Sequence, residues 1–343
     1  LEVRQWISPM LAVLVPVVEK ARSNSNRPSD FRGVLTTFIV NGGGRLLTMA
    51  TQTEPLRREL LVVTGASTGI GAATARELAR RGFHVLAGVR RGIDADALRA
   101  TNLEPIMLDI TNEAEIAALV KHITDDPERR PLRALVNNAG IAVNAPVEAL
   151  PLSEWRRLFD VNFFGHIAMT QALLPALIES RGTVVNITSV GGKLAMATYG
   201  PYAGSKFALE AVSDALRREV EPLGVKVIVV EPGAVTTEMS GRVVVTAERI
   251  TSAMTTEQRD RYAPLMHSII SQAQTYIRKG LPAEDAGRVI ADAITSKRPR
   301  TRYTIGRDAA IIVRLARCLS DRMLDSLLAR SLKPHLPKAL PTT

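Results

Sequence analysis

A glycine-rich turn between an apolar run and a helix-forming run constrains the fold of this 343-residue chain more than any other stretch. Residues 60–63 read Leu-Leu-Val-Val, residues 64–71 read Thr-Gly-Ala-Ser-Thr-Gly-Ile-Gly, and residues 72–81 favour a helix. Gly65, Gly69 and Gly71 allow a tight turn, close approach of the backbone to a pyrophosphate, and close packing of the helix. The helix N-terminus adds amide donors and the positive end of a dipole. A packing turn can contain the same glycines, but the strand before and the helix after favour a dinucleotide site.

The segments after this turn alternate between short apolar runs and helix-forming stretches. We predict strands at 84–89, 106–110, 134–137, 182–188, 225–230 and 302–305, and helices at 112–123, 155–179, 202–221 and 282–295. Strands that alternate with helices along a chain predict a parallel sheet with helices on both of its faces. The predicted fold class is therefore α/β.

The end of the predicted strand 84–89 bears on which dinucleotide the turn would bind. A carboxylate about 20 residues past the glycines would bind the adenosine ribose hydroxyls, but Val89 stands there and Arg90 and Arg91 follow it. Guanidinium groups suit a 2′-phosphate, so the two arginines predict NADP(H) as the preferred cofactor without excluding NAD(H). The alternative is that both arginines are solvent-facing charges of a loop.

A tyrosine and a lysine four residues apart open the predicted helix 202–221. Positions i and i+4 share one face of a helix, so the Tyr202 phenol and the Lys206 ammonium would lie close together. A tyrosine titrates near ~10 in water, and a neighbouring positive charge favours its ionised form. The pair could then act as a general acid/base. If only this pair is considered, the simpler interpretation is that Tyr202 is an aromatic residue at the start of a helix and Lys206 is a solvated charge. Tyr199 has Ala203 four residues on, so it has no such partner.

Other polar residues follow the predicted strands, where open parallel sheets gather their ligands. Asp109 ends the strand 106–110, Asn138 follows the strand 134–137, and Ser189 follows the strand 182–188. Asn162 stands instead among aromatic and aliphatic neighbours of the helix 155–179. A lone asparagine there is usually a hydrogen-bonded group of the core.

Six features taken together resemble the conventional members of the short-chain dehydrogenase/reductase family. They are the turn at 64–71, Asn-Asn-Ala-Gly at 137–140, Asn162, Ser189, Tyr202-x-x-x-Lys206 and Pro232-Gly233. Each is common by itself, but the six occur in the family's order and approximate spacing over about residues 58–306. The resemblance implies a Rossmann-type doubly wound parallel sheet and a nicotinamide cofactor. Residues 205–210 and the apolar residues after 236 look most like the hydroxysteroid and retinol dehydrogenase branch.

The resemblance also implies a catalytic role for each of four residues. Tyr202 would give a proton to a carbonyl oxygen on reduction, or take one from an alcohol on oxidation, while Ser189 holds that oxygen. Lys206 would lower the pKa of Tyr202 and bind the nicotinamide ribose, and Asn162 would anchor a water that links Lys206 to solvent. The cofactor itself carries the hydride chemistry.

Further residues are expected to contact the cofactor by the same resemblance, and no metal site is predicted. Asp109 and Ile110 would flank the adenine, and Val235 and Thr237 the nicotinamide carboxamide. The full set of expected cofactor contacts is Gly65, Ser67, Thr68, Gly69, Ile70, Gly71, Arg90, Arg91, Asp109, Ile110, Asn138, Ala139, Gly140, Tyr202, Lys206, Pro232, Gly233, Val235 and Thr237.

The chain divides into three predicted parts. Residues 49–306 would form the dehydrogenase domain, with a substrate lid at about 236–282 whose Met239, Met254 and Met266 suit an apolar, deformable pocket. Residues 307–343 would form an amphipathic helical tail, packed on its own subunit or a partner, or lying on a membrane surface. Residues 1–48 would be a poorly ordered extension before a natural start at Met49. The apolar run 7–18 in that extension is too short to span a bilayer, which needs about 20 residues.

Charge and cysteine content bound the partners and the compartment. The net charge of +10 lies in the two ends of the chain, because residues 49–296 hold 27 Lys/Arg against 28 Asp/Glu. Without a basic stripe interleaved with aromatic residues, nucleic-acid binding is not expected. The single cysteine, Cys318, cannot form an internal disulfide, so the cytoplasm is the expected location, with membrane attachment through the tail as a variant. The resemblance implies a homodimer or homotetramer built on the helices 155–179 and 202–221.

The expected activity is that of an NADP(H)-dependent oxidoreductase. It would interconvert a secondary alcohol and a ketone or aldehyde on an apolar substrate such as a steroid, a retinoid or another lipid. A 3-ketoacyl reductase or a general carbonyl reductase would share every catalytic residue, and this alternative stays open. A cofactor sensor without turnover, or an interaction subunit docked through the tail, is more distant because Tyr202 and Lys206 are both present.

Overall fold

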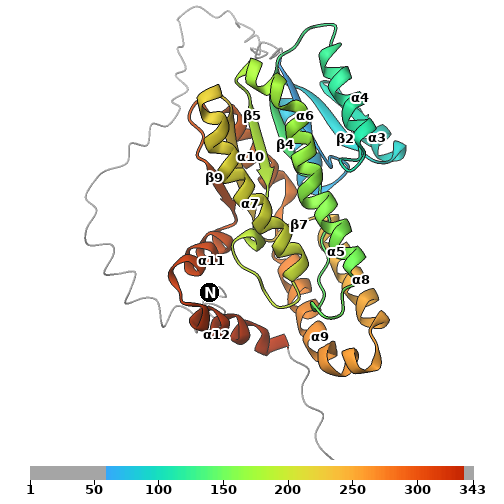
Figure 1. Ribbon diagram of the computed structural model, residues 1–343, viewed down its shortest axis with the longest axis vertical. Helices are drawn as coiled ribbons and strands as arrows, with labels where there is room; N and C mark the ends of the chain where they lie inside the picture. The colour runs from blue at the N-terminus through green and yellow to red at the C-terminus, as the bar shows by residue number, and fades with distance from the viewer. Residues whose placement is uncertain (1–58, 336–343) are drawn as a thin grey trace, which may run out of the picture. The chain divides into compact units, whose positions relative to one another are not determined.

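Seven parallel strands form the central sheet of the computed structural model, which describes residues 59–335. Predictions about residues 1–48 lie outside the described residues. The order across the sheet is β3-β2-β1-β4-β5-β6-β9, and every neighbouring pair is parallel. The predicted doubly wound sheet is therefore confirmed (Figure 1). The strands are β1 (Leu60–Val63), β2 (His84–Val89), β3 (Leu103–Met107), β4 (Leu132–Asn137), β5 (Thr183–Ile187), β6 (Lys226–Pro232) and β9 (Arg302–Ile305).

Both faces of the sheet are buried, because strand side chains point alternately into two apolar clusters. Leu61 and Val63 pack with α2 (Gly69–Arg80) and α10 (Ala283–Thr295) on one face. Leu60 and Val62 pack on the other face with α4 (Glu113–Thr124), α6 (Gly165–Ser180) and α7 (Gly200–Val220). Fully burying such a side chain contributes about 1.5–3 kcal/mol, so the two clusters stabilise the sheet from both faces. The strand order reverses between β1 and β4, which is where open parallel sheets bind ligands.

Three elements differ from the sequence prediction. The third strand was expected at 106–110 but is Leu103–Met107, with Pro105 tolerated because β3 is the edge of the sheet. A short helix that was not predicted, α3 (Gly92–Leu98), follows β2. The helix expected at 155–179 consists of α5 (Leu152–Phe159), the π-helical turn η1 (Asp160–Phe164) and α6.

Within the described part of the chain, one helical stretch has the length and composition to cross a membrane. It is Leu152–Ser180, which comprises α5, η1 and α6. Met169, Leu173 and Leu177 of this stretch are fully buried in the cluster on the sheet. One side of α6 therefore packs in the core of the domain, while Leu152 and Phe164 of the same stretch are exposed.

The region predicted as a lid consists of two helices that lie between two short paired strands. α8 (Glu238–Ala253) and α9 (Thr256–Arg278) lie between the short strands β7 (Val235–Thr236) and β8 (Leu281–Pro282), which pair with each other. Met254 and Met266, which were expected to line a pocket, are buried in a third apolar cluster with Val143 and Leu158, and their role in a substrate lid stays a prediction. These methionines therefore fasten the two helices to the loop after β4 and to α5.

The tail is helical and packs on the domain. It consists of α11 (Arg307–Cys318), α12 (Asp321–Leu332) and the 3-10 turn η4 (Lys333–His335). α11 lies against β9, while α12 and η4 lie against α9, where Gln272 donates a hydrogen bond to the Ser331 carbonyl at 3.2 Å. Ile311 and Met323 remain exposed.

Candidate active site

The glycine-rich turn after β1 brings the N-terminus of α2 to the carboxyl ends of the strands. Gly65 and Gly69 have φ angles of +63° and +57°, which residues with a side chain rarely adopt. A Cβ atom on Gly71 would lie 2.3 Å from the Gly65 carbonyl oxygen and 2.4 Å from Nδ2 of Asn138. The turn can therefore present its backbone amides and the dipole of α2 to a phosphate.

Hydrogen bonds tie this turn to the end of β4. The hydroxyl of Thr64 accepts hydrogen bonds from the backbone N–H groups of Asn138 at 2.9 Å and Ala139 at 3.0 Å. In return, Nδ2 of Asn138 donates to the carbonyl oxygens of Thr64 at 2.9 Å and Gly65 at 3.1 Å. Asn138 and Ala139 were predicted site residues, but Thr64 was not. Its position, a hydroxyl residue between a strand and the first glycine, is the signal that could have identified it.

The start of α7 brings together three of the four predicted catalytic residues. Pro201 lies in the first turn of α7, where its missing N–H costs nothing. The Tyr202 ring, one residue on, and Ser189 Oγ meet at Gly191, where a Cβ atom would lie 3.3 Å from Cε1 of Tyr202 and 3.4 Å from Oγ of Ser189. Ser189 Oγ also accepts from the N–H of Gly191 in the 3-10 turn η2 (Val190–Gly192) at 3.0 Å. Lys206 Nζ lies 5.9 Å from the centroid of the Tyr202 ring and donates to the Ile187 carbonyl at 2.9 Å.

Asn162, the fourth predicted catalytic residue, lies in the π-helical turn η1 and is fully buried. Its Nδ2 donates to the Ile141 carbonyl at 2.8 Å and to Ser205 Oγ at 3.1 Å, and its Oδ1 accepts from the Ile141 N–H at 2.8 Å. Gly140 lies against that same oxygen. Asn162 thus holds the loop after β4 onto α7, and π-helical turns are frequent where a side chain must be aimed at a site.

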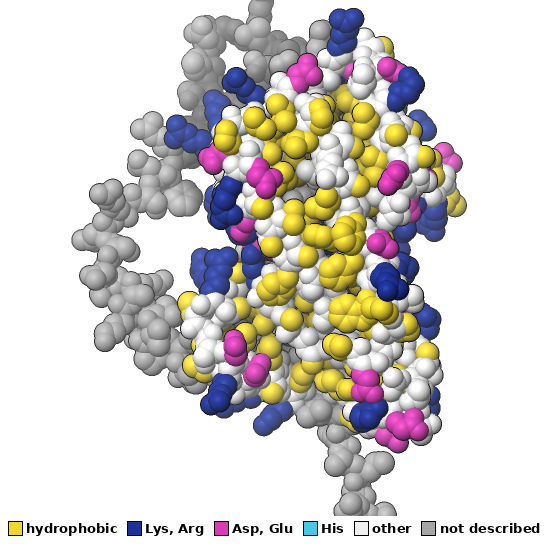
Figure 2. Space-filling view, in the orientation of Figure 1, with side chains coloured by type: hydrophobic (Ala, Val, Ile, Leu, Met, Phe, Trp, Pro, Cys, Tyr) yellow, Lys and Arg dark blue, Asp and Glu magenta, His cyan; other side chains and the backbone are white. Residues whose placement is uncertain are grey.

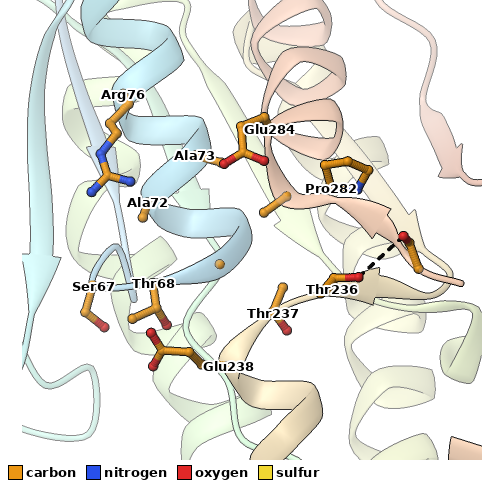
Figure 3. Close-up of a pocket in the computed structure, with 13 residues that line it drawn as sticks. Ser67, Thr68, Ala72, Ala73, Arg76, Thr236, Thr237, Glu238, Pro282 and Glu284 are labelled. Carbon is orange, nitrogen blue, oxygen red and sulfur yellow. Dashed lines mark hydrogen bonds between the residues drawn. The ribbon is translucent and has the colours of Figure 1, made fainter. Parts of the chain in front are cut away.

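A cavity of about 680 Å³ opens beside the glycine-rich turn. Figure 3 shows Ser67 and Thr68 at the turn, the Glu238 side chain just below them, and Thr236 and Thr237 to their right. A Cβ atom on Gly69 would lie 3.0 Å from Cγ2 of Thr237. Helix N-terminal amides beside a cavity of this size fit a phosphate-bearing dinucleotide. The remaining lining residues are Gly69, Ala72, Ala73, Arg76, Thr236, Gly280, Pro282, Ala283 and Glu284.

Arg76 and Glu284 line the cavity but were not predicted site residues. Arg76 lies seven residues after Gly69, and positions i and i+7 share one face of a helix. That spacing could have identified Arg76 from the sequence. Glu284 comes from α10, more than 200 residues away in the chain, and no local pattern points to it.

The family follows from a sequence match over most of this domain. A sequence model of the family described as short chain dehydrogenase matches residues 59–247. The chain is a short-chain dehydrogenase. It is 34% identical over 255 residues to a 3-amino-tetrahydro-pyrrolizinone reductase of Xenorhabdus hominickii, covering 74% of this chain and 89% of the relative. It is also 34% identical over 330 residues to retinol dehydrogenase 5 of Mus musculus, covering 94% and 96%.

Solved structures agree with this assignment. This protein is similar to the solved structure of a short chain dehydrogenase from Burkholderia cenocepacia in complex with NADP, with a TM-score of 0.60 and 26% sequence identity. The match covers 80% of this chain and 99% of the other. The protein is therefore an oxidoreductase that acts on alcohols or ketones and binds NAD(P).

Burial controls the protonation of Tyr202 and Lys206 in this short-chain dehydrogenase. It lowers the pKa of Lys206 to about 8, and the charge of Glu210 opposes that shift. The Tyr202 side chain is partly exposed, but its hydroxyl lies among protein atoms. Burial of the hydroxyl raises the pKa of Tyr202, and the hydrogen bond to Ser189 opposes the rise. The expectation that Lys206 lowers the Tyr202 pKa stays a prediction, because the shift of the Tyr202 pKa comes from burial, Ser189 and Tyr199.

The two arginines after β2 lie in different surroundings in the dehydrogenase. Arg91 makes two ion-pair contacts with Asp94, at 2.7 Å from Nε and 2.5 Å from Nη2. Arg90 is exposed to solvent. Asp109, expected at the adenine, accepts hydrogen bonds from the backbone and hydroxyl of Thr111. Neither the arginines nor Asp109 line the cavity, so their cofactor contacts stay predictions.

The remaining predicted cofactor residues of the dehydrogenase lie at or near the sheet. Ile110 is buried against Gly165, where a Cβ atom would lie 2.7 Å from the isoleucine side chain. Pro232 ends β6, and Gly233 donates its N–H to the Ile305 carbonyl at 2.9 Å. Val235 is buried in β7. Their contacts with a cofactor also stay predictions.

Proposed function

We propose that this short-chain dehydrogenase interconverts a secondary alcohol and a ketone or aldehyde on an apolar substrate, with NADP(H) as cofactor and Tyr202 as general acid/base. The observation that supports this most is the close approach of the Tyr202 ring and the Ser189 hydroxyl at Gly191, with the Lys206 amine 5.9 Å from the centroid of that ring. A nicotinamide cofactor supplies the hydride chemistry when bound. The protein's own residues then need only hold the carbonyl oxygen and move one proton.

Each residue of the group has one task in this proposal. In the reductive direction, Tyr202 gives its hydroxyl proton to the carbonyl oxygen, and Ser189 holds that oxygen by a hydrogen bond. The Lys206 ammonium stabilises the tyrosinate that forms and binds the ribose beside the nicotinamide. Asn162 keeps the loop after β4 in place and anchors a water between Lys206 and solvent.

Replacing Tyr202 tests the proposed chemistry. We expect Tyr202→Phe to lower kcat by about 100- to 10,000-fold, because general acid/base catalysis is worth that much, with little change in cofactor affinity. Tyr199→Phe is the matched control, since its hydroxyl bonds to Asn144 and not to Ser189. Steady-state kinetics with the best substrate of a screen measure both variants. Full turnover by Tyr202→Phe would refute the proposal.

We also propose NADP(H) as the preferred cofactor, supported by Arg90, Arg91 and the NADP complex among the similar structures. A hydrogen bond to a charged group is worth about 1.5–3 kcal/mol. Arg90→Ala and Arg91→Ala should therefore raise KM for NADPH by about tenfold or more. KM for NADH, which lacks the 2′-phosphate, is the internal control and should not change. Equal rises for both cofactors would contradict the selectivity.

The substrate class is proposed as a steroid, a retinoid or another lipid. The match to a retinol dehydrogenase over 94% of this chain supports it, as does the apolar cluster that joins α8 and α9 to the loop after β4. The alternative is a 3-ketoacyl or general carbonyl reductase. Turnover measured over retinoids, sterols, acyl thioesters and simple ketones separates the two, and turnover of acyl thioesters alone would exclude the first.

The tail offers a second proposal about location, in which a cytoplasmic enzyme takes a lipid substrate from a membrane surface. Ile311 of α11 and Met323 of α12 are exposed, and basic residues accompany them in both helices. An exposed apolar side chain beside Lys or Arg suits an anionic bilayer surface. Sedimentation with anionic liposomes should retain the full chain and lose a chain ending at residue 306. Equal partitioning of the two would count against it.

A further inference from the structure

A buried cluster of charged side chains lies behind the candidate catalytic residues. Its members are Lys193 after η2, Glu210 in α7, Glu231 in β6 and Arg302 in β9. The two carboxylates are almost excluded from solvent, with relative exposures of 4% for Glu210 and 1% for Glu231. Buried carboxylates stay charged only when they are paired and hydrogen-bonded. The contacts within the cluster therefore decide how its charge is distributed.

Three hydrogen bonds hold the Glu210 carboxylate in this cluster. Its Oε1 accepts a hydrogen bond from Thr188 Oγ1 at 2.7 Å, and its Oε2 accepts from Lys193 Nζ at 2.6 Å and Arg302 Nη2 at 2.9 Å. Glu231 shares both cations, at 3.7 Å from Lys193 Nζ and 3.3 Å from Arg302 Nε. Because the two cations are shared, neither carboxylate is fully neutralised by a partner of its own.

Glu210 lies one helical turn after Lys206 on the same face of α7. A Cβ atom on Gly192 would lie 3.0 Å from Glu210 Cγ and 3.1 Å from the Lys206 carbonyl oxygen, so the η2 loop covers both residues. Glu210 is the charged group that favours the ammonium form of Lys206 against burial. His166 faces Lys206 from α6, but burial and Lys206 lower its pKa to about 3, so it adds no charge at neutral pH. Tyr202 is also neutral there, since burial raises its pKa.

We propose that Glu210 is a positioning residue that keeps the buried Lys206 amine protonated, and that Lys193 moderates this effect. A buried amine without a carboxylate nearby loses its proton readily, because burial disfavours the charged form. Lys193 binds the same oxygen of Glu210 as Arg302 does and so weakens the attraction that reaches Lys206. The inference rests on the proposed function, since Lys206 is the amine proposed to bind the ribose. The charge of that amine can nevertheless be measured without cofactor or substrate.

The direct test is an NMR titration of the protein labelled with ¹³C at the lysine Cε atoms. The chain has nine lysines, and the signal that Lys206→Arg removes identifies Lys206. Glu210→Gln should move its titration midpoint to lower pH by about one unit. Lys193→Gln should move the midpoint to higher pH. A general loosening of the fold would expose the amine and raise the midpoint in both variants, so the opposite signs separate the two explanations.

Asp214→Asn is the matched control. Asp214 lies one turn beyond Glu210 and binds the same Arg302 nitrogen at 2.9 Å, but it does not act directly on Lys206. Its replacement should shift the Lys206 midpoint far less than Glu210→Gln does, because Asp214 acts on Lys206 only through the Arg302 that it shares with Glu210. A midpoint that stays constant or rises in Glu210→Gln overturns the proposal. If Glu210→Gln does not fold, Lys193→Gln decides it at an unchanged free energy of unfolding, which excludes a general loosening, and a midpoint that fails to rise overturns the proposal equally.

The consequence for cofactor binding has a separate measurement. NADPH affinity, followed by fluorescence between pH 6 and pH 10, should begin to fall at a lower pH in Glu210→Gln than in the wild type. If Lys206→Met binds NADPH as tightly as the wild type does, the proposed role of Lys206 at the ribose fails. The NMR midpoints would still report on Glu210 in that case, so the two failures are distinguishable.

Discussion

At Gly71 the neighbouring atoms leave no space for a side chain. Its helical backbone would accept alanine, but a Cβ atom there would overlap the Gly65 carbonyl oxygen and the Asn138 amide. Overpacking of this kind costs about 1–3 kcal/mol. Gly71→Ala should lower the free energy of unfolding by that amount and weaken NADPH binding more than tenfold, because the turn must move. Urea denaturation and fluorescence titration measure the two effects.

Gly241 is the matched control for this substitution. It is exposed in α8, and a Cβ atom on it would meet nothing within 4 Å. Gly241→Ala should therefore raise the free energy of unfolding by about 0.5–1 kcal/mol, since alanine restricts the unfolded chain more than glycine does. Similar losses for the two variants would show that the contacts of Gly71 do not decide the outcome.

At this scale the sequence predicts residues that local spacing brings together. The i, i+4 spacing of Tyr202 and Lys206 and the glycines at 65, 69 and 71 are local patterns, and the structure brings both groups to the ends of β1 and β5. Contacts between distant segments carry no such pattern. The hydrogen bonds of Thr64 to the end of β4 and the pairing of Asn162 with Ile141 are of that kind. The burial that raises the Tyr202 pKa likewise depends on the whole packed domain.

β9 is held at the edge of the sheet by its first residue, Arg302. Its guanidinium contacts the carboxylates of Glu210, Asp214 and Glu231. Removing one partner of a buried ion pair is strongly destabilising, because a charge is left without compensation. Arg302→Met should lower the free energy of unfolding by about 3 kcal/mol, as urea denaturation would measure.

The exposed ion pair of Arg288 is the control that shows how much of the effect of Arg302→Met comes from burial. It pairs with Asp285 on the exposed side of α10, and exposed pairs contribute about 0–1 kcal/mol. Arg288→Met should therefore change the free energy of unfolding by less than about 0.5 kcal/mol. An equal loss in Arg302→Met and Arg288→Met would contradict the view that the buried cluster holds β9.

Element boundaries show where periodicity misleads. Apolar Ile106 and Leu108 suggested a strand at 106–110, whereas the backbone pairs with β2 through Leu103–Met107 and includes Pro105, which a sequence reading places outside strands. The π-helical turn η1 adds one residue to a helical turn without any change in hydrophobicity. The predicted helix 155–179 therefore appeared continuous.

The whole molecule has an apolar surface that suits a partner of its own kind. Figure 2 shows hydrophobic side chains gathered over the helices α5, α6 and α7. Leu152 of α5, Phe164 of η1 and Phe207 of α7 are 62%, 57% and 44% exposed. Large exposed apolar patches mark interaction sites in soluble proteins. This surface is why we propose a homodimer or homotetramer built on these helices.

A charge on this surface should separate the subunits. We expect the double variant Phe164→Asp, Phe207→Asp to be a monomer by light scattering, because burying two carboxylates would cost more than the apolar contact contributes. Met107→Asp, on the exposed edge strand β3, is the control and should keep the wild-type mass. A double variant with unchanged mass would place the interface elsewhere.

The pairing of β7 with β8 holds the two ends of the segment that contains α8 and α9 next to each other. Val235 and Thr236 pair with Leu281 and Pro282, and the Leu281 N–H donates to the Ala234 carbonyl at 3.0 Å. The residues just before α8 and just after α9 are thus held together by these backbone contacts. Doubling the length of such an inserted segment costs only about 0.6 kcal/mol of closure entropy. The length of the segment between Glu238 and Gly280 can therefore change at little cost in closure entropy, while Thr237 stays packed on Gly69 of the cofactor turn.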